Sequence, residues 1–108
     1  MKIINIHKTI TAEALQKLLD KKLNPLFHQQ KQSDINFLIE IKDGAVEISH
    51  PELYEGFLFR IEIEGSELHI TRSEHYVDDV NSLTLESILS TLFAELAGEN
   101  GVTFVLEG

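Results

Sequence analysis

The stretch that most constrains the fold of this chain is residues 57–72, with the sequence FLFRIEIEGSELHITR. Apolar residues alternate there with mostly charged ones, which is the two-residue period of a strand with one buried face. Gly65-Ser66 interrupts the alternation, and a glycine at the first central position suits a two-residue hairpin loop. That loop pairs Ile63 with Leu68 and keeps the remaining apolar pairs on the same face, so the segment predicts a half-buried β-hairpin.

A second hairpin is predicted in the segment just before the first. Residues 35–49 alternate in the same way around Asp43-Gly44, which is a strong signal for a type I′ turn. His50-Pro51 ends the second strand of this hairpin, because proline cannot donate a hydrogen bond to a ladder. Residues 35–72 therefore predict two antiparallel hairpins.

Two leucine-rich segments flank the hairpins, and both predict amphipathic helices. Thr11 is the expected N-cap of the first helix, which should end near Asn24-Pro25 because proline disfavours helical geometry at the residue before it. The second helix should be capped by Ser82 or Thr84. Gly98 stands where a glycine ends a helix, so we expect the second helix to stop there.

The predicted order of elements is β-α-β-β-β-β-α-β, with MKIINI as the first strand and VTFVL as the last. We expect a single α+β domain over residues 1–108, built as a mixed sheet with two amphipathic helices packed on one face and an acidic polar opposite face. The two terminal strands should pair in parallel through helical crossovers. VTFVL is almost continuously apolar, so it predicts a strand buried on both faces.

The charge of the chain is unevenly distributed and adds up to −9. Residues 1–34 carry six lysines against three acids, whereas the remainder has three cations against fifteen acids. A chain this acidic is repelled by nucleic-acid phosphates and by anionic membranes. The charge therefore predicts neither nucleic acid nor membrane as a partner, and favours a protein with a basic surface.

The absence of cysteine limits the chemistry of the chain. It excludes a disulfide framework, a thiol nucleophile and a thiolate metal site. No apolar run is long enough to span a bilayer, and the first residues lack the apolar region of a signal peptide. These features predict a cytoplasmic protein.

The polar face of the predicted sheet is the candidate binding surface. Its predicted register sets Glu40 against Glu47 and Glu64 against Glu67, and like charges directly opposite each other cost stability. Two interpretations remain open: solvated glutamates that keep the protein soluble, or an acidic patch that faces a partner. The expected contact residues are the acids Glu40, Glu47, Glu62 and Glu64, the apolar anchors Leu38 and Leu58, and Tyr54 at the rim.

Catalytic and metal-binding motifs are absent from the sequence. The five histidines show neither H-x-x-x-H nor H-E-x-x-H spacing, and no phosphate-binding glycine loop or nucleophile motif occurs. Glu62 beside His69 predicts a surface ion pair rather than a catalytic couple. The cluster of acids and histidine in residues 74–79 offers carboxylates to a hard cation, but it lacks the glycine pattern of an EF-hand loop. We therefore predict no enzyme, no cofactor and no metal site.

The two ends of the chain resemble the ends of barstar-type ribonuclease inhibitors. The likeness lies in MKIINI with the leucine-rich segment after it, and in LESILSTLFAELAGENGVTFVLEG. The middle departs from that family, because this chain has two hairpins there and no tryptophan. No inhibitory residue carries over.

Three classes of function are consistent with the sequence. The first is a small acidic protein-binding module, such as an inhibitor, an immunity protein or a chaperone, that engages a basic partner. The second is a structural or assembly subunit that self-associates through its sheet into a homo-oligomer. The third is a small metal-dependent or acid–base enzyme. The uneven charge and the missing catalytic motifs favour the first.

Overall fold

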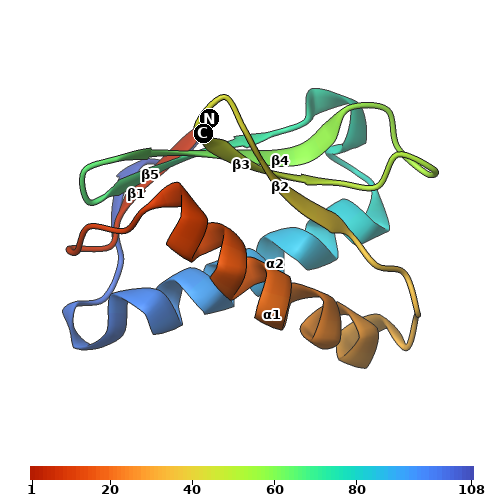
Figure 1. Ribbon diagram of the computed structural model, residues 1–108, viewed down its shortest axis with the longest axis horizontal. Helices are drawn as coiled ribbons and strands as arrows, with labels where there is room; N and C mark the ends of the chain where they lie inside the picture. Colours follow the sequence, from red (N-terminus) through yellow and green to blue (C-terminus); the bar gives the residue numbers. More distant parts are fainter.

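The computed structural model describes residues 1–108 as a six-stranded antiparallel sheet with two helices packed on one face (Figure 1). The fold class is therefore α+β, as predicted. The strands are β1 (Lys2–Asn5), β2 (Leu38–Lys42), β3 (Ala45–Ser49), β4 (Phe57–Glu64), β5 (Glu67–Arg72) and β6 (Thr103–Leu106). The helices are α1 (Ala12–Lys31) and α2 (Val80–Ala97), and the short 3₁₀ turns are η1 (Glu74–Tyr76) and η2 (Gly98–Asn100).

Both predicted hairpins are confirmed with their register. In β4–β5, Ile63 lies opposite Leu68, and in β2–β3, Glu40 lies opposite Glu47. Gly44 has a φ of 78° and Gly65 a φ of 63°, which are the positive values that two-residue primed turns require.

The direction of the terminal strands differs from the prediction. The strand order is β2-β3-β4-β5-β1-β6, and β1 pairs antiparallel with both of its neighbours. Since β5 and β6 both run opposite to β1, they are parallel to each other, as the α2 crossover requires. They do not pair, because β1 lies between them. The expected parallel pairing of the chain ends, and with it the mixed sheet, was wrong.

Helix α1 begins as predicted but continues further. The Thr11 hydroxyl accepts a hydrogen bond from the Ala14 amide at 3.1 Å, which confirms the cap. The helix passes through Pro25 and ends at Lys31, so the predicted end was wrong. A proline leaves the carbonyl four residues earlier without its donor. Here that carbonyl belongs to Lys21, and both residues are exposed to water, while Phe27 in the extra turn is fully buried.

Helix α2 begins earlier than predicted and ends where predicted. Its N-cap is Asp79, whose side chain accepts from the Ser82 amide at 3.0 Å, so neither Ser82 nor Thr84 is the cap. Gly98, with a φ of 63°, ends the helix. The side chains of Leu92 and Phe93 lie in a hydrophobic core of 22 buried residues drawn from both helices and the sheet.

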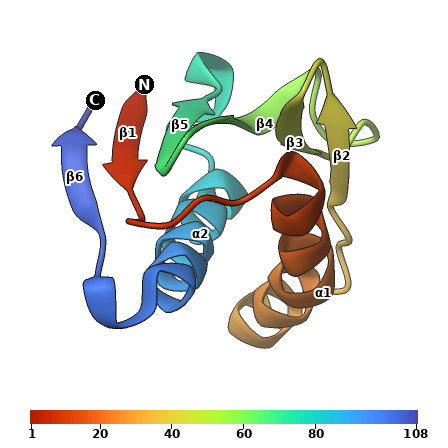
Figure 2. The ribbon, with the colours of Figure 1, turned by 60° about the vertical axis from the view of Figure 1, so that its left-hand side comes forward.

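Strand β6 is exposed rather than buried. It forms the outer edge of the sheet, and each of its four residues is exposed. The apolar run VTFVL therefore does not mark a central strand, and the prediction of burial on both faces was wrong. Figure 2 shows β6 at the margin of the sheet, beyond the two helices.

Candidate functional site

The face of the sheet opposite the helices, called the outer face below, carries the predicted binding surface (Figure 1). Strand register places five carboxylates there with two permanent cations and one histidine. These residues are Glu40, Glu47, Glu62, Glu64, Glu67, Lys42, Arg60 and His69.

Arg60 is the central cation of this group. Its guanidinium lies 2.5 Å from the Glu47 carboxylate and 3.7 Å from that of Glu62. It also donates to the Lys42 carbonyl at 3.3 Å. The Arg60 and Glu47 side chains are only 21% and 14% exposed, whereas Glu62 is 49% exposed. Glu47 is thus held in an internal ion pair, and Glu62 presents its charge to solvent.

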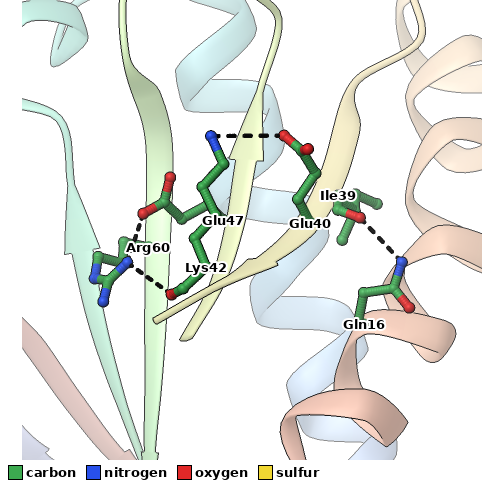
Figure 3. Close-up of polar contacts among 6 residues, drawn as sticks. All are labelled: Gln16, Ile39, Glu40, Lys42, Glu47 and Arg60. Atoms are coloured by element: carbon green, nitrogen blue, oxygen red, sulfur yellow. Dashed lines mark hydrogen bonds and ion pairs between the residues drawn. The ribbon is translucent and has the colours of Figure 1, made fainter. Parts of the chain in front are cut away.

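Each like-charge pair on the outer face has a basic side chain beside it. Glu40 lies opposite Glu47, and the Lys42 ammonium stands 3.8 Å from the Glu40 carboxylate (Figure 3). Together with Arg60, Lys42 offsets the repulsion that opposed carboxylates would cause. The register of the pair was predicted from the sequence, but the compensating cations were not.

The second like-charge pair, Glu64 and Glu67, meets at His69. The Nε2 atom of His69 lies 3.4 Å from the Glu64 carboxylate and 3.1 Å from that of Glu67. Glu62 faces His69 in the strand register, as predicted, yet its side chain pairs with Arg60 instead. Glu64, at 67% exposure, is the most open carboxylate in these outer-face ion pairs.

A β-bulge changes the apolar anchors of the surface. Ile48 pairs with Phe59 and Ser49 with Phe57, so Leu58 has no partner on β3. The Leu58 side chain is fully buried in the core, and its prediction as an anchor was wrong. A bulge leaves one residue unpaired and displaces the alternation of faces. Phe57 takes the place beside Ser49 instead.

Phe57 lines a shallow depression of about 420 Å³ on the outer face. Glu40, Glu47 and Ser49 lie around it, together with the loop 51–56. A half-buried phenyl ring between carboxylates offers a partner both apolar contact and charge. No sequence signal predicted this role of Phe57, because unbroken alternation would place it on the helix side.

The two remaining predicted contacts, Leu38 and Tyr54, differ in their exposure to solvent. Leu38 is 48% exposed on β2, in keeping with its prediction as an anchor. Tyr54 is buried, and its hydroxyl donates to the Asp79 carboxylate at 2.8 Å and accepts from the Asn81 amide at 3.0 Å. The side chain of Tyr54 therefore holds its loop against the N-terminus of α2, and Tyr54 also lines the depression beside Phe57.

The environment of Tyr54 also affects its ionisation. Burial raises the pKa of the Tyr54 phenol above its ordinary value of 10.0, and the hydrogen bond to Asp79 raises the pKa further. The Tyr54 ring packs edge-on against Tyr76, with the ring centres 4.8 Å apart. The Tyr76 hydroxyl accepts from the Glu55 amide at 2.8 Å. The two tyrosines thus pin the loop 50–56 to η1 and α2.

The acidic segment 74–79 forms the turn η1 and the cap of α2. No three His, Asp or Glu side chains of the protein converge closely enough to hold a metal ion. No helix is both long and apolar enough to cross a bilayer.

Comparison with protein-family models, with curated proteins and with solved structures returned no match.

Proposed function

We propose that the protein is a small protein-binding module that engages a basic partner through the outer face of its sheet. The observation that carries the proposal is the charge of that face: five carboxylates stand on one rigid surface against two permanent cations. Both helices pack on the other side of the sheet, so no helix covers this face (Figure 1).

The arrangement suits recognition because it is already ordered. Paired strands hold the carboxylates in place, so a partner meets them without a cost in loop ordering. Glu62 and Glu64 are the most exposed of the predicted contact acids, and Phe57 supplies an apolar contact in the neighbouring depression. Complementary charge of this kind selects partners and speeds their encounter. A reducing cytoplasm is the compartment proposed for a chain without cysteine.

The experiment is a differential capture with matched variants. Glu62→Lys/Glu64→Lys reverses two charges on the outer face. Asp20→Lys/Asp34→Lys makes the same change in net charge at exposed acids on α1 and in the loop before β2. The two variants and the wild type are each immobilised on a resin and incubated with lysate of the native host at low salt. We expect the outer-face variant alone to lose a basic protein, because only that change removes the recognised charge.

The outcome against the proposal is equally clear. If the two variants retain the same proteins as the wild type, the glutamates of the outer face are solvated surface and take no part in binding.

A further inference from the structure

The two edges of the sheet are treated differently by the rest of the protein. The β2 edge is capped by side chains of α1: Gln16 donates to the Ile39 carbonyl at 3.0 Å (Figure 3). Asn24 accepts from the Phe37 amide at 2.8 Å and donates to the Phe37 carbonyl at 3.0 Å, just before β2 begins. Unpaired backbone groups at a sheet edge are a template for another strand, and such side chains block it.

The β6 edge has no such protection. Within residues 1–108, β6 pairs with β1 on one side and with no strand on the other (Figure 2). Phe104 is 54% exposed, and Val105 and Leu106 are exposed to a similar degree. The strand contains neither a charged residue nor a proline, which are the usual devices against strand addition.

A large cavity adjoins this open edge. Its volume is about 1080 Å³, and it is lined by α2, by η1 with residues 55–56, and by the strands β4, β5, β1 and β6. That exceeds the roughly 300–1,000 Å³ of ordinary small-molecule pockets. Its walls mix apolar with polar and charged side chains, and the apolar ones include Ile4, Phe59, Ile70, Leu89, Phe93 and Phe104.

The cavity follows from the number of helices. Strands lie about 4.8 Å apart and packed helices about 8–10 Å apart, so one helix covers about two strands. Two helices therefore cover four of the six strands. The β1–β6 side of the sheet is therefore covered only in part: Phe104 is 54% exposed, whereas Ile4 and Phe93 are buried in the core.

We propose that the free edge of β6 and the adjoining cavity bind an extended segment of a basic protein by strand addition. Backbone hydrogen bonds to β6 supply affinity, and alternate apolar side chains of the segment enter the cavity beside Phe104. The proposal rests on the protein-binding function above and adds a second contact to it. The cavity wall carries both signs of charge: Lys2 lies 5.1 Å from the centre of the Phe104 ring, and Arg72 is paired with Glu86 at 2.9 Å. Glu55 and Glu74 remain to meet basic side chains of the segment.

Charge decides between this occupant and a second copy of the chain. Pairing β6 with β6 of another copy would join two molecules of net charge −9. Net charge of one sign keeps proteins apart, whereas a basic segment is attracted to the same surface. A four-residue edge between two copies would also leave both cavities unfilled.

The test uses a defined probe, the synthetic peptide Lys-Phe-Lys-Val-Lys-Phe-Lys-Val. A control peptide carries proline in place of both valines and has the same charge, but it cannot pair as a strand. Backbone amide signals and amide hydrogen exchange are recorded by NMR with each peptide. We expect the first peptide to protect alternate amides of β6 and to leave β2 unchanged, and the proline peptide to protect neither.

Matched variants localise the effect. Phe104→Lys and Val105→Lys place a charge on the open edge, and Leu38→Lys places one on the capped edge at similar exposure. Each edge variant at β6 should raise the Kd of the peptide by about tenfold or more, whereas Leu38→Lys should raise it by about twofold or less. Thermal melting confirms that each variant is folded.

Several results would overturn strand addition at β6. Equal binding of the proline peptide, absence of binding, or amide shifts confined to Glu62 and Glu64 would each do so. Amide shifts confined to Glu62 and Glu64 would still support the acidic outer face as the binding surface. A dimer of the free protein that Phe104→Lys dissociates would replace the basic segment with a second copy.

Discussion

Arg60 and Glu47 form a partly buried ion pair across β3 and β4, and Glu40 lies directly opposite Glu47. Removing the guanidinium leaves a carboxylate of low exposure without its partner and facing another. We expect Arg60→Ala to lower the free energy of unfolding by about 1–3 kcal/mol, which is the cost of an unsatisfied, partly buried group. Urea denaturation measures the change.

The control for this pair is Lys42→Ala. The Lys42–Glu40 contact is exposed on both sides, and exposed pairs contribute about 0–1 kcal/mol. Equal effects of Arg60→Ala and Lys42→Ala would show that the Arg60–Glu47 pair is no more than a surface contact.

The turn between β2 and β3 depends on the backbone of Gly44. Its φ of 78° is poorly tolerated by β-branched residues. Gly44→Val should cost more than about 1 kcal/mol, as expected for strain in this region. Gly44→Asn should cost less, since asparagine enters positive φ more readily. An unchanged urea midpoint in Gly44→Val would contradict the type I′ turn.

Phe93 tests whether α2 covers the sheet. Its side chain is 2% exposed in the core cluster. Phe93→Ala should destabilise the protein by about 3–5 kcal/mol, as large-to-small changes in cores do. Leu83→Ala, at an exposed site on the same helix, should stay within about 0.5 kcal/mol. If the two variants melt alike, the packing of α2 described above is incorrect.

The burial of Tyr54 and its hydrogen bond to Asp79 make stability depend on alkaline pH. Because the pKa of the Tyr54 phenol is raised in the folded state, the neutral form favours folding. This contribution is fully present below the ordinary pKa of 10.0 and is lost as pH rises through the raised value. Tyr54→Phe should remove this pH dependence. It should also lower the free energy of unfolding by about 1–3 kcal/mol, because the hydrogen bond to the Asp79 carboxylate is lost.

Tyrosinate absorbance measures this directly, since the chain has two tyrosines and no tryptophan. The difference between the titration curves of the wild type and Tyr54→Phe is the curve of Tyr54, and we expect its midpoint above 10.0. A midpoint at or below that value would contradict the network around Asp79.

The hairpins could be predicted from the sequence because local signals determine them. A two-residue turn at Gly44 or Gly65 fixes the register, and the alternation fixes the faces. The direction of β6 relative to β1 has no such local signal, since it depends on where β1 inserts in the sheet. The full length of α1 was missed because the carbonyl freed by Pro25 is solvated, which a rule about proline does not include.

The site was predicted less well than the fold. The acids on the outer face follow from alternation, but the bulge at Leu58 does not, because an extra residue in one strand leaves no trace in the pattern. Because of this bulge, Phe57 lies on the outer face in place of Leu58 and is the apolar contact there. The burial of Tyr54 depends on Asp79, which lies 25 residues further along the chain.

The most direct test of the acidic outer face is the rate at which the captured basic partner associates across a salt series. The wild type should associate fast at low salt and slow down as screening shortens the Debye length to about 8 Å at physiological ionic strength. Glu62→Lys/Glu64→Lys should associate about tenfold more slowly at low salt and show a flatter salt dependence, whereas Asp20→Lys/Asp34→Lys should match the wild type. An unchanged rate and an unchanged salt slope in the outer-face variant would contradict binding through this surface.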